Sequence, residues 1–248
     1  MTTLIIDADV LAYKVCSSLE VATEWEPGYW TWYVDEALVK FHIDQELDRY
    51  MDDFEADKYH LCLTDSGNTF RHKILPTYKG KRSTVKKPLA LLAIRQWMID
   101  EHDAYLKPGL EGDDVMGILA TKKGKDERII ISIDKDMKTI PGLYYRSKED
   151  GVVEISEQEA DYWHLFQTLT GDQTDGYSGC PGIGPAKAEA ILKDNPTWEA
   201  VLKTYKAKGL TEQDALVQAR VARILRSSDY DFKKKEPILW TPSVYTAA

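Results

Sequence analysis

Three short apolar segments, far apart in the chain, each end at an aspartate, and this pattern constrains the fold most. They are residues 3–6 before Asp7, residues 58–64 before Asp65, and residues 128–133 before Asp134. Apolar runs of this length are typical of buried strands in a parallel sheet. Stretches with helical spacing lie between them, as in residues 34–54, so the chain is predicted to be an α/β protein. Its central sheet is expected to be mainly parallel and flanked by helices.

The second half of the chain has a different pattern. From about residue 156 the apolar spacing becomes helical and stays so to about residue 228, and Pro237 and Pro242 mark a tail. We therefore predict an α/β core over residues 1–155 and a helical region over 156–248, packed as one compact unit. Residues 22–33 are interpreted as a local insertion or loop.

Composition excludes several classes of protein. The 248 residues are 43% hydrophobic and 29% charged, which rules out a disordered or fibrous chain. No segment approaches the ~20 apolar residues of a membrane span, so no membrane partner is expected. Residues 1–7 lack the pattern of a signal peptide. Three scattered cysteines argue against a disulfide framework or a zinc site, and they predict a reducing, cytoplasmic compartment.

Acidic residues concentrate at the predicted strand ends and helix starts. The nine candidates are Asp7, Asp65, Glu111, Asp113, Asp114, Asp134, Asp136, Asp172 and Asp175. The net charge is −9, from 41 acids and 32 bases, so without these nine the charges would balance at 32 each. Taken singly, each acid could be a turn former or a helix cap.

Carboxyl ends of parallel strands meet at one edge of a sheet, so we expect the nine acids to converge. Converging carboxylates repel one another and have raised pKa values unless cations neutralise them. Hard divalent ions such as Mg²⁺ or Mn²⁺ prefer oxygen ligands of this kind. A pair of such ions can activate water for phosphodiester hydrolysis. The pattern therefore favours a two-ion site.

A basic segment follows Asp65. No acid occurs between Asp65 and Asp100, and the bases there are Arg71, Lys73, Lys79, Lys81, Arg82, Lys86, Lys87 and Arg95. Together with Phe70 and Tyr78, they suit a phosphate backbone and an unstacked base. A solvent-exposed charged loop is the alternative. The position of the segment, directly after a predicted metal ligand, favours DNA binding.

A glycine-rich turn lies in the helical region. Gly182, Ile183 and Gly184 precede Pro185, the expected start of a helix. Glycines at these positions let backbone N–H groups approach a phosphate, and a helix N-terminus favours its negative charge. Lys187 could add a direct contact. We interpret residues 171–190 as a DNA-binding helix–hairpin–helix, with a plain reverse turn as the alternative.

Together these motifs resemble the 5′-nuclease (flap endonuclease) superfamily, and most closely the phage 5′→3′ exonucleases. The resemblance runs along nearly the whole chain and implies a PIN-like nuclease core over residues 1–155, with a helical arch or clamp at about 76–100. It implies one metal site with ligands Asp7, Asp65, Glu111, Asp113 and Asp114. It implies a second with ligands Asp134, Asp136, Asp172 and Asp175.

The resemblance also implies further roles within these sites. Lys79 and Arg82 would be the basic catalytic pair that reaches the scissile phosphate, acting with the carboxylates of Asp7, Asp65, Asp113 and Asp134. Tyr78 would stack on a base, and a monovalent cation would bind at the hairpin. Asp9 has no required counterpart, and Gly176 stands where asparagine is usual, which we expect to loosen that turn. The predicted arch is short, so either a threaded arch or an open clamp is consistent with it.

The activity implied by the resemblance is 5′→3′ exonuclease with structure-specific flap endonuclease activity. The substrate would be double-stranded DNA with 5′ ends, nicks or 5′ flaps, or an RNA–DNA hybrid, and the products a 5′-phosphate and a 3′-hydroxyl. Phage DNA replication, recombination or primer removal is the expected setting, in the cytoplasm of an infected bacterium. The chain is expected to act as a monomer.

Three alternatives are weighed against this interpretation. Asp7-Ala-Asp9 after a strand fits the acid pair of a haloacid-dehalogenase-type phosphatase, but Leu11 departs from that motif and the hairpin stays unexplained. A catalytically silent DNA-binding protein could share the fold. A PIN-type RNA nuclease would lack the hairpin.

Overall fold

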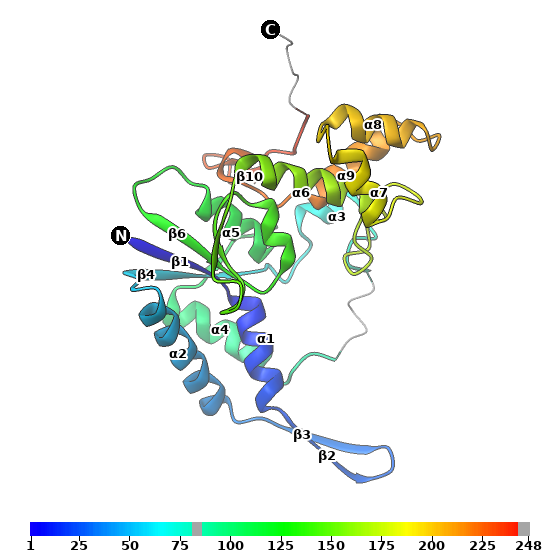
Figure 1. Cartoon of the computed structure of the whole chain (residues 1–248). Helices are drawn as coiled ribbons and strands as arrows, with labels where there is room; N and C mark the ends of the chain where they lie inside the picture. Colours follow the sequence, from blue (N-terminus) through cyan, green and yellow to red (C-terminus); the bar gives the residue numbers. More distant parts are fainter. Residues whose placement is uncertain (81–85, 243–248) are drawn as a thin grey trace.

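The computed structural model describes residues 1–80 and 86–242 of the chain (Figure 1). Its centre is a six-stranded sheet in the order β5-β4-β1-β6-β7-β8. The strands are β1 (Thr2–Asp7), β4 (Lys58–Leu63), β5 (Tyr105–Leu106), β6 (Glu127–Ile131), β7 (Gly142–Tyr145) and β8 (Val152–Ile155). All neighbouring strands run parallel except β8, which is antiparallel to β7. The prediction of a mainly parallel sheet is confirmed.

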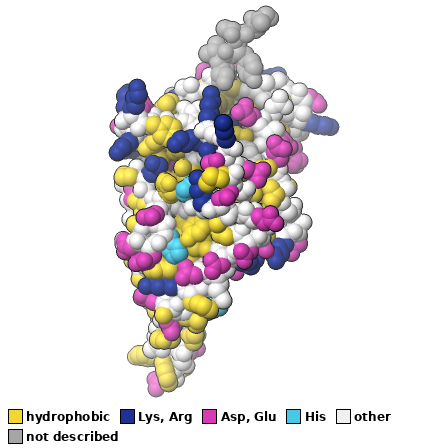
Figure 2. Space-filling view, turned by 90° about the vertical axis from the view of Figure 1, so that its left-hand side faces the viewer, with side chains coloured by type: hydrophobic (Ala, Val, Ile, Leu, Met, Phe, Trp, Pro, Cys, Tyr) yellow, Lys and Arg dark blue, Asp and Glu magenta, His cyan; other side chains and the backbone are white. Residues whose placement is uncertain are grey.

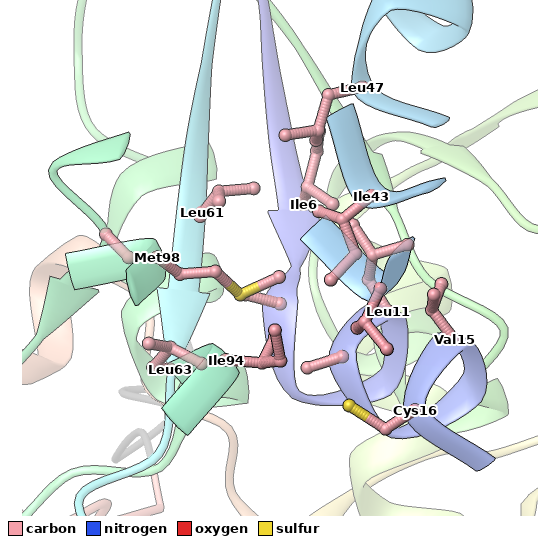
Figure 3. Packing of buried hydrophobic residues seen from close by; sticks show 14 of the residues in the cluster. Ile6, Leu11, Val15, Cys16, Ile43, Leu47, Leu61, Leu63, Ile94 and Met98 are labelled. Carbon is pink, nitrogen blue, oxygen red and sulfur yellow. The ribbon is translucent and has the colours of Figure 1, made fainter. Parts of the chain in front are cut away.

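Alternate side chains of β1 point into two different cores. Leu4 and Ile6 pack with helices α1 (Ala8–Leu19), α2 (Glu36–Asp53) and α4 (Leu91–His102) on one face of the sheet. Figure 3 shows Ile6, Leu11 and Ile94 meeting in this core between the strands and those helices. The period of two along a strand is what separates the faces.

The opposite face of the sheet is covered by other elements. Ile5 packs there with helix α5 (Gly112–Ala120), the 3₁₀-helix η2 (Lys135–Thr139) and residues 224–230 near the end of the described chain. Residues from the predicted helical region therefore contribute to the core of the α/β unit.

The described part of the predicted helical region, residues 156–242, contains four α-helices, α6 (Glu157–Thr170), α7 (Pro185–Leu192), α8 (Trp198–Lys206) and α9 (Glu212–Ala222). They share an apolar core that includes Leu169, Leu192 and Val201. The 3₁₀-helix η3 (Ser227–Asp229) and two short strands, β9 (Tyr230–Asp231) and β10 (Glu236–Pro237), follow. The domain boundary near residue 155 stays a prediction, although β8 ends at Ile155 and α6 begins at Glu157.

The structure gives two of the sequence-based expectations a more definite form. Residues 22–33 form a two-stranded hairpin, β2 (Val21–Glu26) and β3 (Tyr29–Tyr33), that projects beyond α1 and α2 (Figure 1). Residues 91–100 belong to α4, whose Leu91, Ile94 and Met98 are buried in the main core, so this part of the predicted arch is a core helix. In the described ranges, no helix is long and apolar enough to cross a membrane.

Candidate active site

The predicted acids converge at the carboxyl edge of the sheet. Asp7 ends β1, and its neighbours β4 and β6 lead directly to Asp65 and Asp134. The N-terminus of α5 packs against the end of β4, where Gly112 donates its N–H to the hydroxyl of Thr64 at 2.9 Å. A Cβ on Gly112 would lie 3.3 Å from the Cys62 carbonyl, so a small residue allows this close approach.

Two adjoining cavities, of about 260 and about 510 Å³, form the site. Asp136, Asp172 and Asp175 line the smaller cavity. Asp7 and Asp65 line the larger one. Both cavities share the same four residues, Lys79, Glu111, Asp113 and Asp134. The structure therefore brings eight of the nine predicted acids around one divided cleft.

Three of these acids are buried without enough positive charge nearby to keep their pKa values normal. Burial raises the pKa of Asp7 to about 6, against hydrogen bonds from the Val10 N–H and the Ser132 hydroxyl that lower it. Burial and then repulsion from Asp7 raise the pKa of Asp113 well above its usual value. Burial, with repulsion from Asp134, raises the pKa of Asp136 to about 7. Within the described residues, the positive charge of Lys79 near Asp113 and of Lys135 near Asp136 does not offset burial and repulsion.

Glu111 has the opposite electrostatic environment. Burial alone would raise its pKa, but the positive charges of Arg71 and Lys79 outweigh that effect and hold the pKa below its usual value. Lys79 Nζ lies 2.8 Å from Glu111 Oε2 and 3.7 Å from Asp175 Oδ2. Lys79 has a positive φ of 52°, and its backbone N–H donates to the Asp175 carbonyl at 2.7 Å. The ammonium group therefore bridges acids from both halves of the chain.

The expected base-stacking role of Tyr78 is corrected. Its side chain is buried, and its hydroxyl lies 3.0 Å from both Glu111 Oε2 and Asp175 Oδ2. Burial raises the pKa of this phenol far above its usual value, so it is a hydrogen-bond donor to the two carboxylates. The ring supports the cleft wall and is not exposed to a base.

Arg71 and Asp114 are likewise corrected, because they bind each other inside the protein. Arg71 Nη1 and Nη2 donate to the two Asp114 carboxylate oxygens at 2.6 and 2.8 Å, and both side chains are buried. Arg71 also donates to the carbonyls of Val221 and Arg223, at 2.8 and 2.7 Å. This bidentate pair joins α3 (Phe70–Ile74), α5 and the segment after α9. Arg71 is therefore turned inward, away from the surface, and Asp114 is already paired with a cation of the protein.

Of the other predicted basic residues, some border the cleft and the rest lie away from it or outside the described chain. Lys73 is exposed on α3. Lys87 is exposed and lines the larger cavity. Lys86 forms an ion pair with Glu20 and lies 5.0 Å from the centre of the Trp32 ring. Lys81 and Arg82 fall among residues 81–85, outside the described residues.

The predicted hairpin has the geometry of a tight turn that leads into a helix. Gly182 has a φ of 74°, in the left-handed region that favours glycine, and Gly184 is the N-cap of α7. Ile183 donates its backbone N–H to the Cys180 carbonyl at 3.1 Å. The Lys187 ammonium donates to the Gly182 carbonyl at 2.9 Å. Gly182, Gly184 and Lys187 are exposed, so this turn is accessible to a ligand.

The acidic turn upstream of this hairpin is well closed, contrary to the expectation for Gly176. Asp172 Oδ1 accepts the backbone N–H groups of Thr174 and Asp175 at 2.7 and 3.1 Å. Gly176 has a φ of 78°, and a Cβ there would lie 3.2 Å from the Thr77 carbonyl. Glycine therefore fits this turn for both conformational and steric reasons.

Two supporting residues were missed by the sequence analysis. Ser132 donates its hydroxyl to Asp7 Oδ2 at 2.8 Å, and Gln167 donates its amide to Asp136 Oδ1 at 2.6 Å. Ser132 could have been noticed as a polar residue within the apolar run before Asp134. Gln167 lies on α6, and its position in sequence gave no comparable signal.

The donor set fits divalent cations. All eight cleft acids offer hard oxygen ligands, and the raised pKa values of Asp7, Asp113 and Asp136 show a deficit of positive charge. Within the described chain, no three carboxylate, imidazole or thiol groups form a compact ligand set as they stand. The acids are instead divided between the two cavities, so bound ions would draw them together.

Comparison with known proteins assigns this chain to a family. The sequence model described as "5′-3′ exonuclease, N-terminal resolvase-like domain" matches residues 2–159. The exodeoxyribonuclease of Enterobacteria phage T3 is 34% identical, over 96% of this chain and 92% of its own length. The exonuclease of Escherichia phage T7 is 32% identical, over 96% of this chain and 93% of its own. The chain belongs to the 5′-3′ exonuclease family.

Solved structures agree with the fold. The flap endonuclease of bacteriophage T5, in a pseudo-enzyme–product complex with DNA and metal ions, matches with a TM-score of 0.63 at 13% identity. That match covers 90% of this chain and 93% of the other. The T5 5′-exonuclease with bound zinc ions gives a TM-score of 0.62 at 15% identity. At this identity the likeness establishes the PIN-like fold alone.

Proposed function

We propose that this protein is a metal-dependent 5′→3′ nuclease that hydrolyses phosphodiester bonds in DNA. The observation that carries the proposal is the group of buried carboxylates with raised pKa values, Asp7, Asp113 and Asp136, at the carboxyl edge of the sheet. It occurs in a chain whose full-length relatives include the exodeoxyribonuclease of phage T3. Raised acid pKa values in a cleft are typical of a functional site.

Two Mg²⁺ or Mn²⁺ ions are the proposed cofactors. Asp7, Asp65, Glu111 and Asp113 would hold one ion, and Asp134, Asp136, Asp172 and Asp175 the other. When bound, such ions supply an activated water and neutralise charge on the attacking and leaving oxygens. Neighbouring structures crystallised with metal ions support this assignment. A monovalent cation at the hairpin is a further proposal.

The chain's own residues would position the reacting groups. Ser132 fixes one oxygen of Asp7, and Gln167 fixes one oxygen of Asp136. Lys79 lies on the wall shared by both cavities, so a phosphate entering there would compete with Glu111 and Asp175 for its ammonium group. Lys79 would then stabilise negative charge that develops on the phosphoryl oxygens, and Arg82 is proposed to assist it.

The proposed substrate is double-stranded DNA with 5′ ends, nicks or 5′ flaps. The exposed turn residues Gly182 and Gly184, through their backbone N–H groups, and the Lys187 ammonium would bind the duplex backbone without sequence preference. Lys73, Lys86 and Lys87 would add charge near the 5′ end, together with Lys81. The proposed products carry a 5′-phosphate and a 3′-hydroxyl, and RNA–DNA hybrids are a further candidate substrate. Phage relatives support action in the cytoplasm of an infected bacterium.

The competing activities are less consistent with the site. Asp9, which the phosphatase alternative requires as an acid, forms an ion pair with Arg95 and accepts the Thr64 N–H at 2.7 Å. The Asp9 carboxylate therefore links α1 to α4 and to the end of β4. A silent DNA-binding protein would have no need for acids with raised pKa values at the centre of the cleft.

The test uses 5′-end-labelled duplexes with and without a 5′ flap. Mg²⁺ is expected to give short labelled products, and EDTA or Asp134→Asn is expected to stop their release without abolishing DNA binding. Lys79→Ala should lower the cleavage rate more than it weakens binding, whereas the exposed, distant Lys233→Ala should change neither. Binding without cleavage by the wild-type protein would indicate the silent-binder alternative.

A further inference from the structure

The hairpin of β2 and β3 is an exposed aromatic surface outside the proposed active site. Every residue of both strands is solvent-exposed, including Trp25 at 72%, Tyr29 at 71% and Tyr33 at 66%. The tapering lower end in Figure 2 is this projection, with hydrophobic side chains at its tip. Among the described residues, β2 and β3 pair only with each other. A lone two-stranded hairpin is marginally stable in water. Exposed apolar surface of this kind is typical of a site that binds another molecule.

The charge around the hairpin disfavours nucleic acid as that partner. Residues 15–39 contain five acids and no lysine or arginine, and three of the acids, Glu20, Glu24 and Glu26, lie in or next to the hairpin. A DNA backbone would be repelled by this segment. Lys86, whose ammonium group lies 5.0 Å from the centre of the Trp32 ring, is already paired with Glu20.

The sequence of β3 is a palindrome without any charge. It reads Tyr29-Trp30-Thr31-Trp32-Tyr33, which is the same in both directions about Thr31. Aromatic and β-branched residues favour strands, and an uncharged edge strand readily pairs with another edge. The two strands differ in this respect, since β2 carries Glu24 and Glu26.

We propose that β3 pairs antiparallel with β3 of a second copy of this chain, with Thr31 on the two-fold axis. In that register Thr31 faces Thr31 of the partner, and each tryptophan faces a tryptophan of the partner. A two-fold interface requires this kind of self-complementarity. Trp30 and Trp32 already stack within one chain, with ring centres 6.3 Å apart. The pairing would therefore bring four tryptophans together on one face of the two strands.

The expected dimer is weak and dependent on concentration. Each aromatic side chain can bury about 150–250 Å² at most, and those of β3 are already partly covered, so the interface lies near the lower limit for stable complexes. Because the hairpin projects from the body beyond α1 and α2 (Figure 1), the two bodies stay apart in this arrangement. The inference departs from the monomer expected from sequence, and it does not depend on the proposed nuclease activity.

A cysteine introduced at the axis provides the direct test. Opposed residues in antiparallel strands have Cα atoms about 4.5–5.5 Å apart, a separation that suits a disulfide. Thr31→Cys should therefore give a reducible covalent dimer under mild oxidation. Thr23→Cys, opposite Thr31 within the same hairpin, is the matched control and should cross-link far more slowly. The three native cysteines are buried, which keeps the background low.

Charge reversal tests the same register without a covalent bond. Sedimentation velocity should show a wild-type dimer that forms at rising concentration. Thr31→Lys and Thr31→Glu should each weaken it by about tenfold or more, because like charges would face each other across the axis. An equimolar mixture of the two variants should restore dimers.

The proposal is overturned if the wild type stays monomeric at all concentrations, or if Thr31→Cys and Thr23→Cys cross-link equally. It is also overturned if a Trp30→Ala, Trp32→Ala double variant loses duplex DNA binding while its sedimentation is unchanged. The last result would make the hairpin a nucleic-acid surface.

Discussion

Asp113 and Asp114 are neighbours on α5 and yet have opposite electrostatic environments. Asp114 is fully buried against Arg71, with both carboxylate oxygens bound by the guanidinium. Asp113 lines both cavities, and burial together with repulsion from Asp7 raises its pKa. One acid thus holds three segments of the fold together, while the other lies buried beside like charges whose repulsion an ion would offset.

The comparison shows that the placement of the counter-charge, and not the type of residue, separates structural from functional acids here. A buried acid with its own cation is a structural link whose loss is costly. A buried acid among other acids destabilises the metal-free protein, and a ligand must offset that cost. The four predictions below test this distinction, from the largest expected effect to the smallest.

Asp113→Asn should reduce cleavage by about 10²–10³-fold or more, because it removes an acid shared by both cavities from the proposed ion site. Binding to a duplex, measured by fluorescence anisotropy, should be nearly unchanged. Asp100→Asn, on the exposed side of α4, is the control and should cleave normally. Full activity of Asp113→Asn would contradict its assignment as a functional acid.

Arg71→Met should destabilise the protein by about 3–5 kcal/mol, because it leaves the buried Asp114 carboxylate without its partner. Urea unfolding monitored by circular dichroism measures this change. In EDTA, Asp113→Asn should change stability in the opposite direction. It should raise the urea midpoint of unfolding, since it removes a repelling charge. If Asp113→Asn and Arg71→Met shifted the midpoint in the same direction, the distinction between the two acids would fail.

In the metal-free protein, the contribution of Asp7 and Asp136 to stability should fall as the pH rises from about 4 to about 7. Asp7 and Asp136 have pKa values of about 6 and about 7 in the fold, against 3.8 for an ordinary aspartate, so the folded state binds their protons more tightly. Their contribution to the free energy of unfolding is therefore greatest at acidic pH and is lost as the two carboxyl groups ionise. Mg²⁺ should restore it near neutral pH and raise the melting temperature by several degrees.

The comparison for this pH experiment is Asp136→Asn. Burial lowers the pKa of His164 to about 3, which gives a pH dependence of the opposite sign in both proteins. Melting temperature is measured against pH for both proteins in EDTA. The difference, wild type minus Asp136→Asn, isolates the contribution of Asp136 to stability. If this difference in melting temperature did not decrease as the pH rises from about 4 to about 7, the raised pKa of Asp136 would be contradicted.

Asp9→Asn should have the smallest effect, with a loss of about 1 kcal/mol and normal cleavage. Its carboxylate is partly exposed and already paired with Arg95, so it belongs with the compensated acids. Thermal unfolding and the duplex assay measure the two quantities. A large loss of cleavage by this variant would move Asp9 into the functional set.

The sequence predicted the parallel sheet and the convergence of the cleft acids because both depend on local patterns. Apolar runs that end in aspartate fix the strands, and parallel strands place their carboxyl ends together, as with Asp7, Asp65 and Asp134. The bounds of β1, β4 and β6 follow from the same runs.

The roles of Arg71, Asp114 and Tyr78 could not be predicted in this way, because they depend on tertiary contacts. Arg71 sits in a basic segment but turns inward to an acid 43 residues away and to carbonyls about 150 residues away. The sequence alone does not tell which of Asp113 and Asp114 is structural and which is functional. The difference arises from the tertiary contacts of Asp114 with Arg71 and with the segment after α9.

A calorimetric titration of Mg²⁺ tests most directly whether the buried acids of the cleft form an ion site. The wild-type protein near neutral pH should show saturable binding, and Asp113→Asn should weaken that binding by about tenfold or more. Asp100→Asn should bind as the wild type does. Equal Mg²⁺ binding by the wild type and Asp113→Asn, or none by either, would contradict the account.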